Sequence, residues 1–155
     1  MIRAFELEDK DYIINSHYQV FNREFQYDLS FKAFIAKRVE EIVTRSDSKE
    51  QIWIVEVDGK QKGSICLMKK DEETAQLGLF LVEPTLRGAG YGQQLIEVAI
   101  NFSKKVGFKR MILWTNSELT SARKLYERNR FTLKTTQIQT LSNKELIEEM
   151  WELTL

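Results

Sequence analysis

The chain has 155 residues, of which 43% are hydrophobic and 30% are charged, a balance that predicts one globular domain over residues 1–155. Lys and Arg together number 23, as do Asp and Glu, so the positive excess of a typical nucleic-acid-binding protein is absent and we expect no nucleic-acid partner. The single cysteine, Cys66, excludes an internal disulfide and a cysteine-based zinc site.

The composition of the first residues predicts no targeting signal. The N-terminus becomes acidic at Glu6, before any apolar stretch of signal-peptide length, and no run of about 18 apolar residues occurs in the chain. We therefore expect no membrane partner and a cytoplasmic location, in which Cys66 packs as a small core residue.

A short strand at residues 2–5 and two helices are predicted first. Asp9 or Asp11 can cap the first helix, which carries the only histidine, His17. The second helix begins after Ser30, and its apolar residues recur every three or four positions until it ends near Ser46.

Three strands follow. Residues 52–57 and 63–68 are rich in β-branched and apolar side chains, and Asp58-Gly59 between them is typical of a tight hairpin turn. Residues 74–82 become apolar at consecutive positions, as expected of a central strand that is covered on both faces.

The remaining elements alternate. A helix begins near Gln93 and ends near Gly107, and it is followed by a strand at residues 111–115, a helix at 120–128 and strands at 131–138 and 149–155. The order β-α-α-β-β-β-α-β-α-β-β predicts an α/β (α+β) fold with a mixed sheet of about seven strands, and it disfavours a doubly wound nucleotide-binding fold. The terminal strand is expected at an edge or a dimer interface, which leaves a homodimer open.

Residues 84–92 hold three of the seven glycines and the only proline, and we call this segment the glycine loop. Glycine accepts positive φ and lets a ligand approach the main chain, so a glycine-rich loop before a helix predicts an anion site. Gln93 and Gln94 stand where a nucleotide-hydrolysing loop needs Lys and Ser or Thr. The spacing of Gly88, Gly90 and Gly92 also departs from the dinucleotide fingerprint.

The spacing that does fit is Arg-x-x-Gly-x-Gly, filled by Arg87, Gly90 and Gly92. It resembles the acetyl-CoA signature of the GCN5-related N-acetyltransferase (GNAT) superfamily. Residues 122–131, Ala-Arg-Lys-Leu-Tyr-Glu-Arg-Asn-Arg-Phe, resemble the second motif of that family, which usually ends Leu-Tyr-x-x-x-Gly-Phe. Two motifs in the expected order identify the family more strongly than either alone.

The resemblance extends from about Tyr12 to Leu155 and is closest to the GNAT domains fused to MarR-type winged-helix regulators in some bacterial proteins. It rests on residues 81–84, 113–117 and 150–153. We expect no winged helix before Met1 and therefore a stand-alone domain. The resemblance implies a mostly antiparallel sheet with helices on both faces.

It also implies acetyl-CoA as the cofactor, CoA as the product, and no metal. The CoA pyrophosphate is expected on the glycine loop, and the pantetheine arm and thioester on the preceding strand. The implied cofactor-binding residues are Phe80, Leu81, Val82, Arg87, Gly88, Ala89, Gly90, Tyr91, Gly92 and Asn116. The match to the family motif is weakest at Asn116, because the commoner spacing would put the asparagine at position 119, where this chain has Leu119. The alternative is that Asn116 merely ends a strand.

Tyr126 matches the family tyrosine that stands near the CoA sulfur, and the resemblance implies that it is the general acid. The alternative is a core tyrosine on a helix face with Leu119 and Ala122. Arg130 occupies the usual glycine position, and we expect Asn129 to take the left-handed conformation there.

The sequence does not specify the general base. Glu24, in the aromatic-rich stretch 21–28, is a catalytic candidate that could bind or deprotonate a substrate ammonium, and the alternative is a solvent-exposed carboxylate. A lone histidine among apolar neighbours is expected to pack rather than react. The nearby aromatic residues are expected to be mostly core, with one or two facing an acceptor cleft: Phe21, Phe25, Tyr27, Phe31 and Phe34.

We therefore predict an acyltransferase of the N-acetyltransferase type. It transfers the acetyl group of acetyl-CoA to a primary amine of a small molecule or peptide by direct attack in a ternary complex. The alternative is a catalytically weak or inactive module on the same fold that binds CoA, senses it or binds a partner. The absence of an identifiable base, together with Leu119 and Arg130, favours that alternative.

Overall fold

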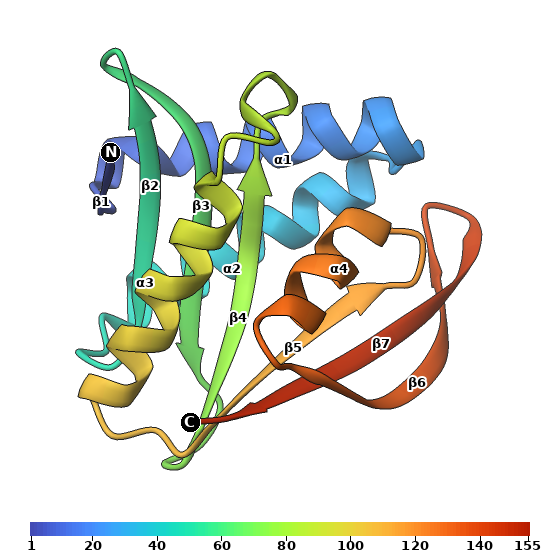
Figure 1. Ribbon diagram of the computed structural model, residues 1–155. Coiled ribbons are helices and arrows are strands. Elements are labelled where there is room, and N and C mark those ends of the chain that lie inside the picture. Colours follow the sequence, from blue (N-terminus) through green and yellow to red (C-terminus); the bar gives the residue numbers. More distant parts are fainter.

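The computed structural model describes residues 1–155 and contains a seven-stranded sheet between two layers of helices (Figure 1). The strands are β1 (Ile2–Ala4), β2 (Gln51–Val57), β3 (Lys60–Lys69), β4 (Thr74–Val82), β5 (Arg110–Asn116), β6 (Thr132–Leu141) and β7 (Lys144–Thr154). The helices are α1 (Lys10–Phe25), α2 (Leu29–Arg45), α3 (Tyr91–Lys105) and α4 (Thr120–Arg128), with single 3-10 turns at Leu7–Asp9 and Pro84–Leu86.

The strand order is β1-β2-β3-β4-β5-β7-β6, and every neighbouring pair is antiparallel except β4 and β5. Helices α1 and α2 cover one face of the sheet, whereas α3 and α4 cover the other (Figure 1). The predicted fold class is confirmed, including the mostly antiparallel sheet with helices on both faces.

The position of the terminal strand was predicted wrongly. β7 lies between β5 and β6, so β6 forms the edge of the sheet. The reason is a tight turn at Ser142 and Asn143, whose φ values of 53° and 59° connect two strands that are longer than predicted. Residues 139–148, which carry no motif, therefore continue the sheet instead of forming a loop.

Local signals explain most element boundaries. Asp58 and Gly59 have φ values of 52° and 76°, which confirms the predicted hairpin turn. The cap of α2 is Asp28, because its Oδ1 accepts a hydrogen bond from the Ser30 amide at 2.9 Å. Asp9 precedes α1 but does not cap it, since its carboxylate binds Arg3 at 2.8 and 2.9 Å.

The core has two parts, one on each face of the sheet. Trp53, Leu95 and Met111 belong to the part under α3 and α4, and Ile54 to the part under α1 and α2. Cys66 is fully buried in the second part, as predicted, and burial raises the pKa of its thiol to about 12. None of the four helices is long and apolar enough to cross a membrane.

Candidate active site

The sheet opens between its two parallel strands. β4 and β5 pair only from Thr74 to Gln76, opposite Arg110 to Ile112, and beyond Gln76 the side of β4 that faces β5 has no strand partner. Figure 1 shows the two strands diverging from that point. The main chain of residues 77–82 therefore forms a free edge inside the fold, which an extended ligand can extend by strand-like hydrogen bonds.

A bulge interrupts β4 within this free edge. Leu79 has a positive φ of 46°, and its carbonyl accepts a hydrogen bond of 2.6 Å from the Ser64 hydroxyl. Leu77 packs on the α3 side of the sheet and Leu79 on the α2 side, after which Phe80 faces the α3 side again. A left-handed conformation costs a leucine about 1–2 kcal/mol, and such strain gathers at functional sites.

A cavity of about 730 Å³, the larger cavity below, lies where the end of β4 meets the glycine loop, α1 and α4. It brings together the predicted cofactor-binding residues Phe80, Leu81, Val82, Arg87, Gly88, Gly90, Tyr91 and Gly92. Ala89 belongs to the loop but does not line the cavity, and Asn116 lines a second cavity instead.

Backbone conformation explains two of the three loop glycines. Gly88 and Gly90 have φ values of 85° and 89°, and a Cβ at either position would meet open space. A side chain there is disfavoured because L residues rarely adopt this conformation. At Gly92 the reason is steric, since a Cβ would lie 3.1 Å from Leu125 Cδ2 and the Leu125 side chain would have to move by a few tenths of an ångström.

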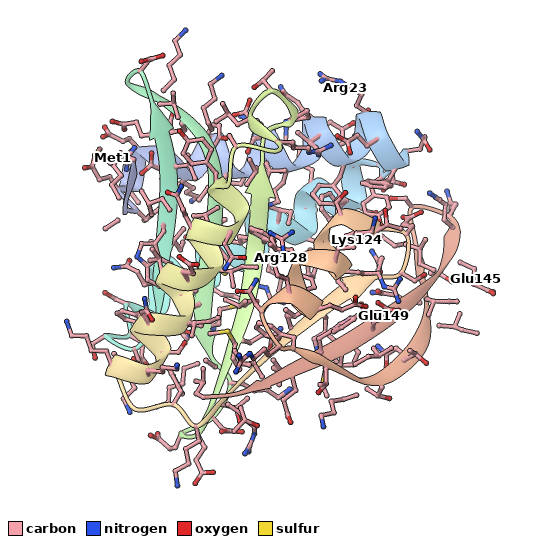
Figure 2. The ribbon with its side chains drawn as sticks, in the orientation of Figure 1. Met1, Arg23, Lys124, Arg128, Glu145 and Glu149 are labelled. Atoms are coloured by element: carbon pink, nitrogen blue, oxygen red, sulfur yellow. The ribbon has the colours of Figure 1, made fainter.

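The larger cavity carries charges of both signs. Arg87 Nη2 lies 2.8 Å from Glu24 Oε1, so α1 and the glycine loop are joined by an ion pair. Arg128 also lines the cavity, and Figure 2 labels it at the end of α4. The positive end of α3 begins directly after the loop, which makes the loop the most favourable part of the cavity for an anion.

A second cavity of about 210 Å³, the smaller cavity below, adjoins the first on the α2 side of β4. Four residues line both cavities and mark their junction: Phe21, Phe80, Leu119 and Tyr126. More aromatic side chains face a cavity than predicted, since the smaller one is lined by Phe21, Tyr27, Phe31 and Phe34, while Phe25 lines the larger one.

Tyr126 lies at this junction. Its ring is 6% exposed and lies 5.9 Å from the ring of Phe131 and 6.2 Å from that of Phe80, centroid to centroid. Its hydroxyl has no hydrogen-bond partner within the protein, and burial raises its pKa. Tyr126 is therefore a core residue and a cavity residue at once.

The ring of Tyr126 also faces that of Trp151 on β7, and a contact close by holds β7 to α4. Arg123 Nε donates to Glu149 Oε1 at 2.8 Å, and Figure 2 labels Glu149 on β7 close to α4. This contact fixes α4, and with it Tyr126, against the sheet.

A hydrogen-bonded group that no sequence motif indicated connects the two cavities. The Tyr27 hydroxyl donates to Glu118 Oε1 and accepts from Asn116 Nδ2, both at 2.7 Å. Burial and the nearby carboxylate raise the pKa of Tyr27. Tyr27 lines the smaller cavity and Glu118 the larger one. Asn116 ends β5, as one interpretation predicted, and its contact with pantetheine stays a prediction.

His17 lines the smaller cavity but is 2% exposed. Its Nδ1 lies 2.8 Å from the Ile13 carbonyl oxygen, and its Nε2 has no partner. Burial lowers its pKa to about 4, so the ring is neutral at pH 7. The prediction that it packs is confirmed.

The prediction that Asn129 adopts the left-handed conformation is wrong. Arg130 itself has a φ of 70°, whereas Asn129 has a φ of −92°. The Asn129 side chain instead exchanges two hydrogen bonds of 2.8 Å with Gln93, and these connect α4 to α3.

No group of three or more His, Cys, Asp or Glu side chains is arranged to hold a metal ion.

The chain resembles proteins of known family in sequence. It is 30% identical over 92 residues to an uncharacterised N-acetyltransferase of Methanocaldococcus jannaschii, which covers 56% of this chain and 41% of that protein. It is 31% identical over 83 residues to the mycothiol acetyltransferase of Beutenbergia cavernae, covering 52% of this chain and 28% of that protein. The chain thus spans less than half the length of both curated relatives.

Solved structures share the whole fold. A GNAT-family acetyltransferase of Staphylococcus aureus Mu50 superimposes with a TM-score of 0.82 at 19% identity, covering 100% of this chain and 98% of that one. The yncA protein of Salmonella typhimurium, solved with its cofactor acetyl-CoA, gives 0.77 at 16% identity, with 100% and 93% coverage. These TM-scores establish a common fold. The model of the acetyltransferase (GNAT) family matches residues 12–131, so the chain belongs to the GNAT family of acetyltransferases.

Proposed function

We propose that this protein is an N-acetyltransferase that uses acetyl-CoA to acetylate a primary amine of a small molecule or peptide, by direct attack in a ternary complex. One observation carries the proposal: two adjoining cavities meet at Tyr126, beside the free edge of β4, and the glycine loop lines the larger one. This arrangement gives a phosphate-bearing donor and an amine acceptor separate sites with a common meeting point.

The residues of the larger cavity fit acetyl-CoA. The glycine loop and the N-terminus of α3 would hold its pyrophosphate, and the edge of β4 at Phe80, Leu81 and Val82 would pair with its pantetheine amides. The volume of about 730 Å³ lies within the range of roughly 300–1,000 Å³ that is usual for small-molecule and cofactor pockets. When bound, acetyl-CoA supplies an acetyl thioester whose carbonyl carbon an amine can attack.

Tyr126 is the proposed general acid. Its hydroxyl has no partner in the protein and its pKa is raised by burial, so it keeps its proton and can donate it to the departing sulfur. The surrounding rings fix the position of Tyr126 from several sides. The same burial that keeps the phenol neutral also makes its hydrogen bonds strong.

The acceptor must lose a proton before it attacks. An alkylammonium with a pKa of about 10.4 is deprotonated at pH 7 at a cost of about 4.6 kcal/mol. We assign the proton path to Tyr27, a residue in the lining of the smaller cavity, whose hydroxyl passes its own proton to Glu118 as it accepts one from the amine. The Glu118 Oε2 lies 3.6 Å from Lys144 Nζ and its side chain is 30% exposed, so it can release the proton to solvent.

Glu24 stays a predicted catalytic residue that could bind or deprotonate the acceptor, but its surroundings support another role. It lines the larger cavity and not the smaller one, and its carboxylate binds Arg87. In our proposal Glu24 therefore tunes the charge of the glycine loop, and proton removal belongs to Tyr27 and Glu118.

Two measurements on the purified protein separate the enzyme from a CoA-binding module without turnover. We expect acetyl-CoA to raise the melting temperature, and mass spectrometry to detect a singly acetylated product from at least one amine in a varied panel. Stabilisation without any acetylated amine would support the module instead. Absence of an acetyl-CoA-dependent shift would exclude both.

A further inference from the structure

The smaller cavity contains two charged side chains that lack an ionic partner. Arg38 of α2 and Glu148 of β7 are the only residues in its lining that are charged at pH 7, because His17 is neutral. Arg38 makes its polar contact with Met68 Sδ at 3.0 Å, and Glu148 accepts one hydrogen bond of 2.6 Å from Gln137. The chain thus leaves one charge of each sign available to a ligand of this cavity.

The surroundings of Arg38 favour a carboxylate. Its guanidinium lies over the Phe34 ring, 5.5 Å from the ring centre, and a methionine sulfur is only a weak acceptor. A planar guanidinium with free donors binds a carboxylate through two parallel hydrogen bonds.

The position of Arg38 determines which end of a ligand it can reach. It does not line the larger cavity, whereas Tyr126 lines both. Its contact Met68 stands opposite Gln76, the last residue of β4 that is paired with β5. Arg38 therefore lies toward the closed end of the opening between the strands, and a carboxylate that binds it leaves an amine on the neighbouring carbon on the side of Tyr126.

The cavity between these points is small and apolar. Its volume of about 210 Å³ is below the roughly 300–1,000 Å³ of pockets for drug-sized ligands. The rings of Phe21, Phe31 and Phe34 form one wall. We propose that the acceptor is a free amino acid with an apolar side chain, whose carboxylate binds Arg38 and whose ammonium is attracted by Glu148. This inference rests on the proposed acetyl transfer.

Matched pairs of acceptors test the role of the carboxylate. L-Phenylalanine is compared with phenethylamine and L-leucine with 3-methylbutylamine, because each pair differs only by the carboxylate. Binding to the CoA-saturated protein is followed by intrinsic tryptophan fluorescence, to which Trp114 in the lining of the smaller cavity contributes, and turnover by kcat/KM. We expect the amino acid of at least one pair to bind, and to react, at least tenfold better than its decarboxylated partner.

Three variants identify the source of this preference. R38Q is expected to weaken amino-acid binding at least tenfold and leave the decarboxylated amine within about twofold, because a charge-assisted bidentate pair is lost. R38K retains the positive charge but lacks the planar guanidinium that can donate two parallel hydrogen bonds. It is therefore expected to recover only part of the preference for the amino acid. K37Q removes a positive charge from an exposed neighbouring residue and is expected to leave the binding of both ligands unchanged.

The outcomes are distinguishable from failure of the proposed function. If the wild-type protein binds the amino acid selectively and R38Q abolishes this selectivity, the inference is supported even when no amine is acetylated. Failure to acetylate any amine would count against the proposed transferase activity but not against the amino-acid site. A wild-type protein that binds both members of each pair equally, or prefers the decarboxylated amine, would overturn the inference. It would also be overturned if R38Q weakened both members of a pair to the same extent, because Arg38 would then be structural.

Discussion

Glu24 of α1 and Arg87 of the glycine loop form an ion pair with 2.8 Å between Oε1 and Nη2. The two side chains are 26% and 48% exposed, so the pair is partly screened by water. A phosphate that binds Arg87 competes with the Glu24 carboxylate. The pair therefore lowers the affinity of the loop for an anion.

We expect E24Q to lower the Kd for acetyl-CoA by about two- to fivefold, which is the scale of a partly exposed pair, and to leave kcat within about threefold. Calorimetric titration at low and high salt measures the effect. E127Q serves as the control, because Glu127 is exposed on α4 and outside both cavities. A fall in kcat of a hundredfold or more would instead make Glu24 the general base.

The hydrogen bond between Tyr27 and Glu118 predicts a shared effect on proton removal. Y27F and E118Q are each expected to lower kcat/KM by at least about tenfold, toward the range of roughly 10²–10⁴ for loss of general base catalysis. The deficit should shrink as pH rises toward the pKa of the amine, because less substrate then needs deprotonation. A deficit that is constant from pH 7 to 10 would contradict the proton path.

The buried His17 predicts a pH dependence of stability. Its pKa is about 4 in the folded protein against about 6.5 when unfolded, so the unfolded chain binds more protons between these values. The free energy of unfolding should therefore fall as pH is lowered from about 6.5 to about 4, by on the order of 3 kcal/mol. Urea denaturation across this range measures the slope.

His17→Asn keeps a polar group near the Ile13 carbonyl and is expected to flatten the slope. The titration of Asp9 does not contribute to this slope. Burial raises its pKa, but hydrogen bonds from Arg3 lower it to a net value of about 2, so its contribution is lost only below the window. An unchanged slope in His17→Asn would show that His17 is not the group responsible.

The left-handed Arg130 predicts that R130G stabilises the protein. A residue with a Cβ pays about 1–2 kcal/mol at this φ, and part of the gain is offset by the greater freedom of glycine in the unfolded chain. We expect a net gain of about 0.5–1 kcal/mol in chemical denaturation. R130A removes the same side chain but keeps the Cβ, so an equal gain in R130A would contradict the backbone explanation.

Sequence reasoning succeeded where the signal is local. The glycine loop, the Asp58-Gly59 turn and the amphipathic helices are each specified by residues a few positions apart, and the structure has all of them. Tyr126 was singled out by a motif on the same helix, and the structure puts it at the junction of the two cavities.

The features that were missed depend on contacts between distant residues. Asn116 meets the Tyr27 hydroxyl across 89 positions, and Arg38 of α2 and Glu148 of β7 line one cavity although they lie far apart in the sequence. The bulge at Leu79 could not be predicted from the sequence, because the surrounding apolar run is equally compatible with a regular strand. Gly63 is a sequence signal of the close approach between β3 and β4 that was not used. A Cβ at this position would lie 2.5 Å from the Leu81 carbonyl oxygen.

The initial rate of amine-dependent thiol release from acetyl-CoA, compared between the wild-type protein and Y126F, tests the central claim most directly. We predict release that saturates with the amine and falls at least about tenfold in Y126F, because the buried phenol donates the proton to the departing sulfur. Y18F, which alters a tyrosine outside both cavities, should retain the wild-type rate. A wild-type rate that does not depend on any amine, or a decrease of less than threefold in Y126F, would contradict the account.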